Sequence, residues 1–426
     1  MPFNDASQHT ITGLPVWDGD GYRGSSSISW SDGRIDSVAP AQKVGGGNAM
    51  ADAGYARNVQ AHAEDDLGLS IIPGLVDTHL HLEYPSTTVA DTFSWGLYTP
   101  PEEMSLHVLA NAQECARFGV TTMRDMASHA VEIAVSRALS EGVIRGPRVL
   151  ADGEVGMTAG HGDLFTPPRA EQRNPVADSP DECHKLVRVW ARQGTTGIKI
   201  YLSGGVLSLG DKVAWRNQTR AEIRATIDEA HALGMQVAAH CHTTDSIQIA
   251  LDEHVDSIEH ATAMTVEQMQ CIAQRRIPVA PTLLVNEVIA YRSSAVSAIA
   301  RDKARKIIEG RNPMFRRAAE CGVRFVLGTD ACKNLVAYGD QMEEVRLMSK
   351  IFGWGAERTM AAATSDAADS MRIGDQAGRL IAGSSADFIV IKGRPWERID
   401  DLDVNNIVAV VSKGRVVSGS IEGLRG

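Results

Sequence analysis

The chain of 426 residues lacks long hydrophobic runs, blocks of Lys and Arg, and paired cysteines. No stretch approaches the about 20 apolar residues that a membrane-spanning helix needs. The formal net charge of -11 argues against nucleic acid or an anionic membrane surface as a partner. Residues 1–7 have neither the basic nor the apolar segment of a signal peptide. We therefore expect a soluble protein that acts on a small molecule.

The cysteines show no CxxC spacing and no dense framework of the kind that disulfide-rich domains have. We interpret them as reduced thiols and expect a cytoplasmic location. With 43% hydrophobic and 22% charged residues, the composition is that of an ordinary globular protein. Its length suffices for one large domain and a smaller one. The six cysteines are Cys115, Cys183, Cys241, Cys271, Cys321 and Cys332.

The middle of the chain alternates short apolar runs with amphipathic helical segments. Residues 220–233, for example, place apolar side chains every three to four positions, which is typical of a helix. Gly119, Gly234 and Gly322 each stand between a helical segment and a strand, where a left-handed cap is favoured. Eight β-then-α units predict an α/β fold with a (β/α)8 TIM-type barrel. The predicted strands are 71–78, 121–125, 148–151, 197–201, 236–240, 257–260, 278–282 and 324–329.

Both ends of the chain differ from the middle and resemble each other. Residues 10–39 alternate apolar and polar side chains between turns, and residues 385–391 and 407–417 do the same, with Lys413-Gly414 at a turn. The glycine-rich stretch 45–51 predicts a surface loop. We predict a small β-sandwich domain built from residues 1–70 and 376–426, beside a catalytic barrel of residues 71–375.

Polar side chains follow the predicted barrel strands at their carboxyl ends. In Asp77-Thr78-His79-Leu80-His81, the two histidines lie on the same face of a strand, because side chains alternate with a period of two. Active sites of such barrels are built at the carboxyl ends of the strands. Taken singly, a histidine at a strand end is more often a structural, hydrogen-bonded residue than a ligand. The joint pattern also includes Lys199, His240, His260 and Asp330.

Imidazole and carboxylate groups together suit zinc, manganese or cobalt, and the lack of thiolate ligands indicates a catalytic metal site. Lys199 is the unusual member, because a charged ammonium has no lone pair to offer a cation. Burial lowers the pKa of a lysine, and a neutral amine can take up CO2 to form an anionic carbamate. The alternative interpretation of Lys199 is a barrel lysine held in an ion pair.

These residues resemble the amidohydrolase superfamily along nearly the whole chain. Residues 157–163, Met-Thr-Ala-Gly-His-Gly-Asp, and residues 199–206 are similar to the imidazolonepropionase-like and Xaa-Pro dipeptidase-like branch. The resemblance implies that His79, His81 and Asp330 hold one metal and that His240 and His260 hold the other. It further implies that carboxylated Lys199 bridges the two ions, most simply Zn2+. A metal-bridged hydroxide would then attack the substrate, with Asp330 as general base.

Three further residues are candidates for contacting the substrate. His161 lies on a glycine-flanked loop after the third predicted strand, and either polarises the carbonyl, anchors the substrate, or is a solvated loop histidine. Tyr201 and His242 each follow a predicted ligand by two residues, so a continuing strand would turn them to the same face; each could equally pack against the rim. The loops beyond the strands also offer Trp95 and Tyr98 as candidates for an apolar wall, and Arg169 or Arg173 as the candidate for a carboxylate contact.

The resemblance implies a hydrolase of an amide bond in an N-acyl amino acid, a dipeptide or an ochratoxin-like amide. One alternative is hydrolysis of urea-type or carbamate-type xenobiotics. A second is a ring deaminase with one metal, although such sites do without a carboxylated lysine. A third is a binding protein that kept the barrel without its chemistry, which the complete ligand set disfavours. Because assemblies are frequent among similar proteins, we also expect a homo-oligomer.

Overall fold

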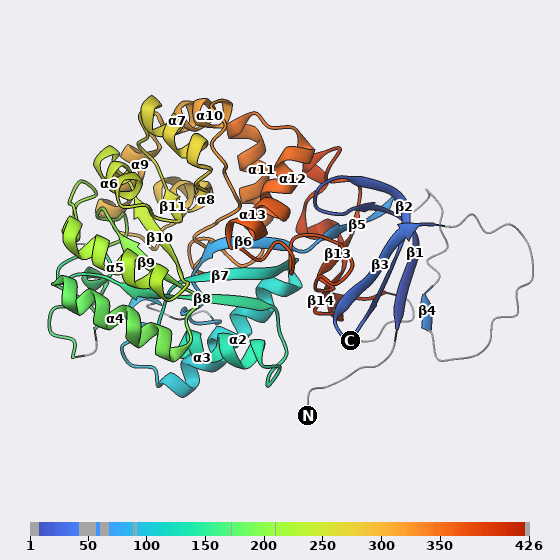
Figure 1. Cartoon of the computed structure of the whole chain (residues 1–426), viewed down its shortest axis with the longest axis horizontal. Helices are drawn as coiled ribbons and strands as arrows, with labels where there is room; N and C mark the ends of the chain where they lie inside the picture. Colours follow the sequence, from blue (N-terminus) through green and yellow to red (C-terminus); the bar gives the residue numbers. More distant parts are fainter. Residues whose placement is uncertain are drawn as a thin grey trace, which may run out of the picture.

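The structure is a computed structural model that describes residues 8–41, 57–59, 68–87, 89, 92–171, 173–208 and 210–421. The stretch 45–51, predicted as a loop, lies outside the described residues. Two bodies of β-structure lie side by side, a barrel ringed by helices and a sheet built from the two ends of the chain (Figure 1). No described helix is long and apolar enough to cross a membrane.

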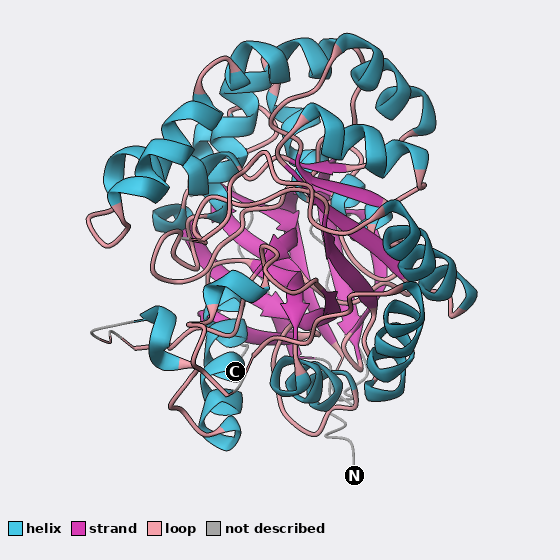
Figure 2. Cartoon of the chain, turned by 90° about the vertical axis from the view of Figure 1, so that its left-hand side faces the viewer, coloured by secondary structure: helices cyan, strands magenta, loops and turns pink. Residues whose placement is uncertain are grey.

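The barrel contains a parallel sheet of seven strands in sequence order, and helices surround it (Figure 2). The strands are largely buried, as expected where helices cover the outer face and side chains fill the interior, and several of them carry polar side chains among the apolar ones. The strands are β6 (Leu75–Leu80), β7 (Val120–Ser128), β8 (Arg148–Val155), β9 (Gly197–Tyr201), β10 (Gln236–Cys241), β11 (Ser257–His260) and β12 (Val279–Ala280).

The helices follow from amphipathic patterns closed by local capping signals. At the start of α5, the Thr219 side chain accepts a hydrogen bond from the backbone amide of Glu222, and the Glu222 side chain accepts one from the backbone amide of Thr219. These two reciprocal bonds form a capping box. The helices are α1 (Thr92–Trp95), α2 (Pro101–Arg117), α3 (Ala130–Ser140), α4 (Pro180–Gln193), α5 (Arg220–Ala232), α6 (Thr244–Asp252), α7 (Val266–Arg275), α8 (Leu283–Glu287), α9 (Ala298–Ile308), α10 (Arg311–Glu320), α11 (Gln341–Phe352), α12 (Ala356–Ala363) and α13 (Ser365–Ser370). Short 3-10 or π turns span Asp163–Phe165, Val288–Arg292, Ile399–Asp401 and Val404–Asn406.

The eighth predicted strand, residues 324–329, is not a regular strand, and this part of the prediction is wrong. The segment nevertheless closes the ring between β12 and β6 through backbone hydrogen bonds. The Val326 amide donates to the Val279 carbonyl at 3.0 Å, and the Thr78 amide donates to the Leu327 carbonyl at 2.9 Å. The segment and the residues just after it pair through isolated bridges, Val279 with Phe325 and Leu80 with Ala331, and the backbone leaves the extended conformation at Asp330, where φ is 57°. The ring of the barrel is therefore closed by backbone hydrogen bonds, as predicted for the fold class.

The first predicted strand, residues 71–78, is two strands that belong to different sheets. β5 (Leu69–Pro73) pairs with β13 of the terminal sheet, and β6 begins the barrel. The chain crosses between the sheets at Gly74, where an added Cβ would lie 2.1 Å from Oγ1 of Thr121. Only glycine fits this close approach of two strands. The domain boundaries at 70/71 and 375/376 stay a prediction, although the terminal sheet extends to Pro73.

The terminal sheet joins the two chain ends in one mixed sheet, in the order β15-β14-β13-β5-β1-β2-β3 with β4 beside β1. Its halves share an apolar core in which Trp30 meets Phe388 edge to face at 5.1 Å between ring centroids. The predicted β-sandwich domain is confirmed. Its strands are β1 (His9–Trp17), β2 (Tyr22–Ser31), β3 (Arg34–Pro40), β4 (Arg57–Val59), β5, β13 (Phe388–Lys392), β14 (Ile407–Ser412) and β15 (Arg415–Gly419).

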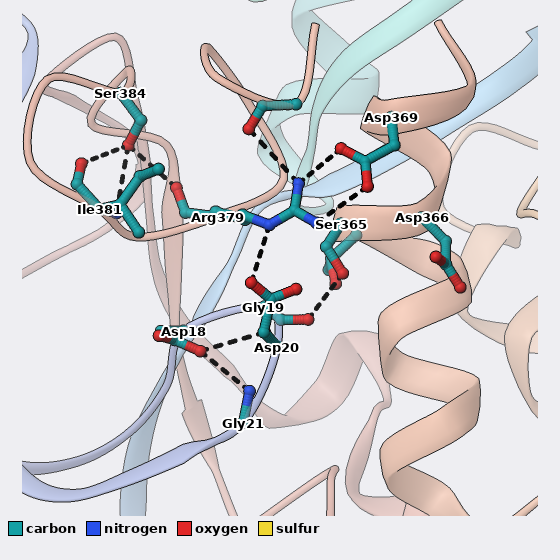
Figure 3. A network of polar contacts seen from close by, with 12 residues as sticks. Asp18, Gly19, Asp20, Gly21, Ser365, Asp366, Asp369, Arg379, Ile381 and Ser384 are labelled. Carbon is teal, nitrogen blue, oxygen red and sulfur yellow. Dashed lines mark hydrogen bonds and ion pairs between the residues drawn. The ribbon is translucent and has the colours of Figure 1, made fainter. Parts of the chain in front are cut away.

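A polar network fastens the terminal sheet to the barrel (Figure 3). The guanidinium of Arg379 donates to Asp20, in the turn after β1, at 2.9 Å, and to both carboxylate oxygens of Asp369 in α13 at 2.7 and 2.9 Å. Ser365 donates to the Gly19 carbonyl at 2.7 Å. A bidentate arginine fixes orientation as well as distance. The network therefore holds the two bodies of the chain in one arrangement.

Candidate functional site

The metal-ligating and catalytic residues predicted from the sequence all line one cavity of about 710 Å3 at the carboxyl end of the barrel. The structure therefore brings together side chains that are up to about 250 positions apart in the chain. β6 and β9 to β11 supply most of them from their last residues or from the residues just beyond. The set is His79, His81, His161, Lys199, Tyr201, His240, His242, His260 and Asp330.

Left-handed backbone places two of these side chains. His260 has a φ of 68° and Asp330 a φ of 57°, which is uncommon outside glycine. In a regular strand Glu259 and His260 would point to opposite faces. The turn at His260 ends that alternation, so both side chains are buried inside the barrel, at 0% and 4% exposure. Strained backbone of this kind is common at functional sites.

The nitrogen and oxygen atoms of the site form two clusters of metal-ligand type. His79, His260 and Asp330 offer ligand atoms within 4.8 Å of one another, and so do His240, His242 and His260. Nε2 of His81 lies 3.1 Å from Oδ1 of Asp330, which brings His81 to the first cluster. The clusters share His260 and include His242, which differs from the ligand partition that the resemblance implies. Imidazole and carboxylate donors at this spacing fit divalent transition metals.

Hydrogen bonds from one ring nitrogen orient several of these imidazoles. Nδ1 of His79 lies 2.7 Å from Oε2 of Glu259, and Nδ1 of His260 lies 2.7 Å from Oγ1 of Thr282. With Nδ1 engaged, Nε2 is the nitrogen left for the cavity. Histidines that ligate metals show this arrangement, because the second partner fixes the tautomer and the ring orientation.

Burial governs the charges at the centre of the site. The pKa values of His240 and His260 are held well below the usual range by burial first and by neighbouring imidazoles second. These rings are therefore neutral and keep a lone pair. Burial also lowers the pKa of Lys199, which is 2% exposed, against the opposing charges of Glu259 and Asp330. A lysine in this environment is shifted toward the neutral amine.

Asp330 remains a carboxylate. Burial raises its pKa, but the hydrogen bond from His81 and the basic side chains around it outweigh burial and bring the pKa to about 2. The same bond keeps the pKa of His81 raised despite the opposing effect of burial. Asp330 is thus the anionic acceptor of the cavity.

Glu259 and Arg124 are functional residues that the sequence interpretation missed. Glu259 is fully buried and accepts hydrogen bonds from His79, from Ser257 at 2.7 Å and from Arg124 at 3.1 Å. Arg124 also donates to the Thr78 carbonyl at 2.7 Å. Glu259 stands directly before His260 in the sequence, and the alternation of a regular strand by itself would place the two side chains on opposite faces.

The outer wall of the cavity mixes aromatic and charged side chains. Trp95 lines it, as predicted, whereas Tyr98 and Arg169 are not among the lining residues. Arg173 also lines it, but its guanidinium binds Asp163, with Nε at 2.9 Å from Oδ1. His129 and Glu154 were not predicted; Nε2 of His129 lies 3.0 Å from Oε2 of Glu154. This bond and the charge of Glu154 raise the pKa of His129 to about 9 although burial opposes the shift.

A barrel with histidines, a buried lysine and an aspartate at the carboxyl end of its strands is the framework of a hydrolytic enzyme with a site for metal. The family comparison matches residues 70–417 to the Amidohydrolase family. The chain belongs to this family, as the resemblance predicted, and is a hydrolase acting on amide bonds.

Relatives and solved structures agree with this assignment. The chain is 28% identical to ochratoxinase from Aspergillus niger over 366 residues, which cover 81% of this chain and 74% of the relative. The crystal structure of a Xaa-Pro dipeptidase with bound methionine superposes with a TM-score of 0.82 at 28% identity, covering 96% of this chain and 99% of that one. The crystal structure of A. niger ochratoxinase has a TM-score of 0.82 at 24% identity, covers 98% of this chain and 96% of that one, and shares the fold.

Proposed function

We propose that the protein is a binuclear metal-dependent hydrolase that cleaves the amide C–N bond of a small molecule. The observation that carries the proposal is the burial of Lys199 among imidazoles and a carboxylate at the floor of the cavity. An ammonium there would oppose a bound cation, whereas a carbamate on a neutral lysine would support one. Lys199 carboxylated by CO2 therefore fits the neutral histidines around it.

The ligands in this proposal are His79, His81, Lys199, His240, His260 and Asp330. Divalent ions held by these residues, most simply two Zn2+, would supply Lewis acidity and would bring the pKa of water from 15.7 to about 7. Mn2+ and Co2+ suit the same nitrogen and oxygen donors. The hydrogen bond that His79 donates to Glu259 and the contact between His260 and Thr282 hold the ligand rings in place.

Asp330 is the proton carrier of the proposal. Its carboxylate is ionised, 24% exposed to the cavity and 3.1 Å from His81. It takes a proton as water attacks the carbonyl carbon and returns that proton to the departing amine nitrogen. Such general base and acid steps contribute about 10² to 10⁴ in rate. His161, Tyr201 and His242 stand around this position and are the candidates for binding and polarising the substrate.

The substrate class that we infer is an N-acyl amino acid, a dipeptide or an ochratoxin-like amide. Support comes from relatives that are named ochratoxinase and Xaa-Pro dipeptidase and that match most of the chain. The cavity of about 710 Å3 is large enough for a drug-sized molecule. Its aromatic wall at Trp95 suits an apolar acyl or side-chain group.

Metal content and the mass of the Lys199 peptide test the proposal. We expect about two divalent ions per chain, measured by plasma mass spectrometry on protein purified without chelator. A CO2 adduct should appear on the Lys199 peptide under non-acidic conditions. Turnover is then assayed on N-acyl amino acids, dipeptides and aryl amides. One ion and a bare lysine would contradict the proposal and favour a ring deaminase.

The variant Lys199→Ala provides a second test. We expect it to lose metal and activity, with partial rescue by a short carboxylic acid that replaces the carbamate. Lys185→Ala is the matched control, because Lys185 is exposed on α4. Undiminished metal content in Lys199→Ala would exclude the bridging role.

The proposal also includes a homo-oligomer in the cytoplasm, with no nucleic acid or membrane partner. Light scattering coupled to size-exclusion chromatography measures the assembly, and a monomer at working concentration would contradict this part. Cell fractionation tests the location.

A further inference from the structure

His161 is buried against the metal-type centre and is fixed by groups outside it. Its ring stacks on His240 with 4.6 Å between centroids and an interplanar angle of 30°, and it meets Tyr201 edge to face at 5.2 Å. The residue is 8% exposed. The turn at Gly205 is shaped around this ring, since an added Cβ there would lie 1.8 Å from Cε1 of His161.

The Nδ1 atom of His161 faces a serine and an aspartate from the loop after β9. Nδ1 lies 2.9 Å from Oγ of Ser208 and 3.4 Å from Oδ2 of Asp211. The Ser208 hydroxyl donates its hydrogen to Oδ1 of Asp211 at 2.6 Å. Because that hydrogen is already used, the Ser208 oxygen can only accept from His161. Nδ1 of His161 therefore carries a hydrogen.

Asp211 is an ionised carboxylate that is buried and accepts hydrogen bonds. It is 3% exposed, and its Oδ2 accepts the backbone amide of Gly205 at 2.9 Å. Burial opposes ionisation, but the bonds from His161 and Ser208 prevail and hold the pKa of Asp211 below its usual range. A carboxylate with these donors cannot supply a hydrogen to the imidazole.

Lys303 anchors the aspartate from a helix that follows β12. Its ammonium, on α9, lies 3.1 Å from Oδ1 of Asp211 and donates to the carbonyls of Gly205 at 3.0 Å and Ser208 at 2.8 Å. The ammonium offsets the charge of the carboxylate, so Asp211 can fix the ring without requiring a charged imidazole. The contact also ties the loop after β9 to the helical segment after β12.

We propose that Asp211, held by Lys303, is a positioning residue that locks His161 with its hydrogen on Nδ1 and presents Nε2 to the substrate. The inference rests on the proposed function, because the substrate of that site is the group that Nε2 meets. Nothing in the chain order predicts it, since residues 161, 211 and 303 follow different strands. A carboxylate that orients a histidine from behind is a recurring device of catalytic sites.

A double-mutant cycle tests whether Asp211 acts through His161. We expect Asp211→Asn, whose amide can donate to Nδ1, to lower kcat/KM about 10- to 100-fold, the usual effect of losing such a partner. His161→Gln should lower it at least as much. The double variant should be no worse than His161→Gln alone, because both changes remove one function. Additive losses would overturn the proposal.

Nitrogen-15 NMR of histidine-labelled protein gives a readout that does not depend on turnover. We expect the His161 signal, assigned by its loss in His161→Gln, to report hydrogen on Nδ1 in the wild type and a change of tautomer in Asp211→Asn. A wild-type signal with hydrogen on Nε2 alone would overturn the proposal. Lys303→Met should lower kcat/KM and Lys303→Arg should restore part of it; equal loss in both would indicate a purely structural role.

The two proposals fail in different ways. Absence of metal and of turnover on every amide tested would reject the proposed function, while the NMR measurement would still report the state of His161. Normal metal content and turnover with additive double-mutant losses would reject the role of Asp211 alone. Metal content should be unchanged in Asp211→Asn, because Asp211 is not among the proposed ligands.

Discussion

Left-handed backbone, with positive φ, occurs in both the barrel and the terminal sheet but has a different role in each. In the terminal sheet, positive φ occurs at turns, as at Asp32 and Lys413, each followed by a glycine that also has positive φ. This is the pattern of a type I′ hairpin turn, which reverses the chain. In the barrel, positive φ occurs at His260 and Asp330, where it aims a side chain into the cavity. At these two barrel positions the left-handed backbone serves the site, whereas at the two hairpins of the sheet it serves connectivity.

The interiors of the terminal sheet and of the barrel also differ in polarity. The core of the terminal sheet is apolar, with Trp30 and Phe388 at its centre. The interior of the barrel buries Lys199, Arg124 and Glu259, each less than 5% exposed. Buried charges cost solvation energy that their mutual attraction repays only with good geometry. The comparison indicates that the terminal sheet contributes stability and the barrel interior contributes chemistry, and the following changes test that division.

The largest effect is expected from Asp330→Asn. Removing the proton acceptor should lower kcat by about 10³-fold or more, since general acid and base catalysis alone contributes 10² to 10⁴. Circular dichroism should show an intact fold. Asp228→Asn is the matched control, because Asp228 is exposed on α5. A wild-type kcat in Asp330→Asn would refute the assigned base.

Phe388→Ala should lower the stability of the fold and leave catalysis unchanged. The side chain is fully buried against Trp30, and truncating such a phenylalanine costs about 3–5 kcal/mol of unfolding free energy. Urea unfolding measures the loss. At a temperature where the variant is folded, kcat should match the wild type. A large fall in kcat there would mean that the terminal sheet shapes the site through β5 and β6.

Glu259→Gln sharpens the comparison inside the barrel. The glutamine keeps the shape but loses the charge that accepts from His79 and Arg124. Metal affinity, measured by competition with a chelator, should fall about 10- to 100-fold. Glu267→Gln, at an exposed position of α7, serves as control. Equal affinities in the two variants would show that Glu259 does not support the ligand.

The smallest effect concerns the pH dependence of stability. Burial lowers the pKa of His129, but the hydrogen bond that His129 donates to Glu154 and the charges of nearby carboxylates outweigh burial and bring the folded pKa to about 9, against an ordinary value of 6.5. A raised histidine pKa stabilises the fold fully below pH 6.5, and this stabilisation is lost as the pH rises through 9. The unfolding free energy should therefore decrease from pH 6.5 to 9, and His129→Gln should reduce that decrease. An identical pH profile in the variant would contradict the assignment.

Much of the fold follows from local patterns. The runs at residues 197–201 and 257–260 match β9 and β11, and Gly119, Gly234 and Gly322 have the predicted positive φ. The errors are at residues 71–78 and 324–329. In the first, an unbroken apolar run hides the change of sheet at Gly74, which depends on the approach of Thr121. In the second, the run looks like a strand although the backbone turns at Asp330.

The sequence alone was enough to predict that the histidines, Lys199 and Asp330 share one site. Each of them lies in or just after a predicted strand, and both the alternation along a strand and the geometry of a parallel barrel are regular properties. Only the folded chain decides that Glu259 shares the interior with His260 and that Asp211 and Lys303 meet behind His161. These contacts join residues from different β/α units. Their distances depend on backbone turns and loop paths, which no spacing in the sequence expresses.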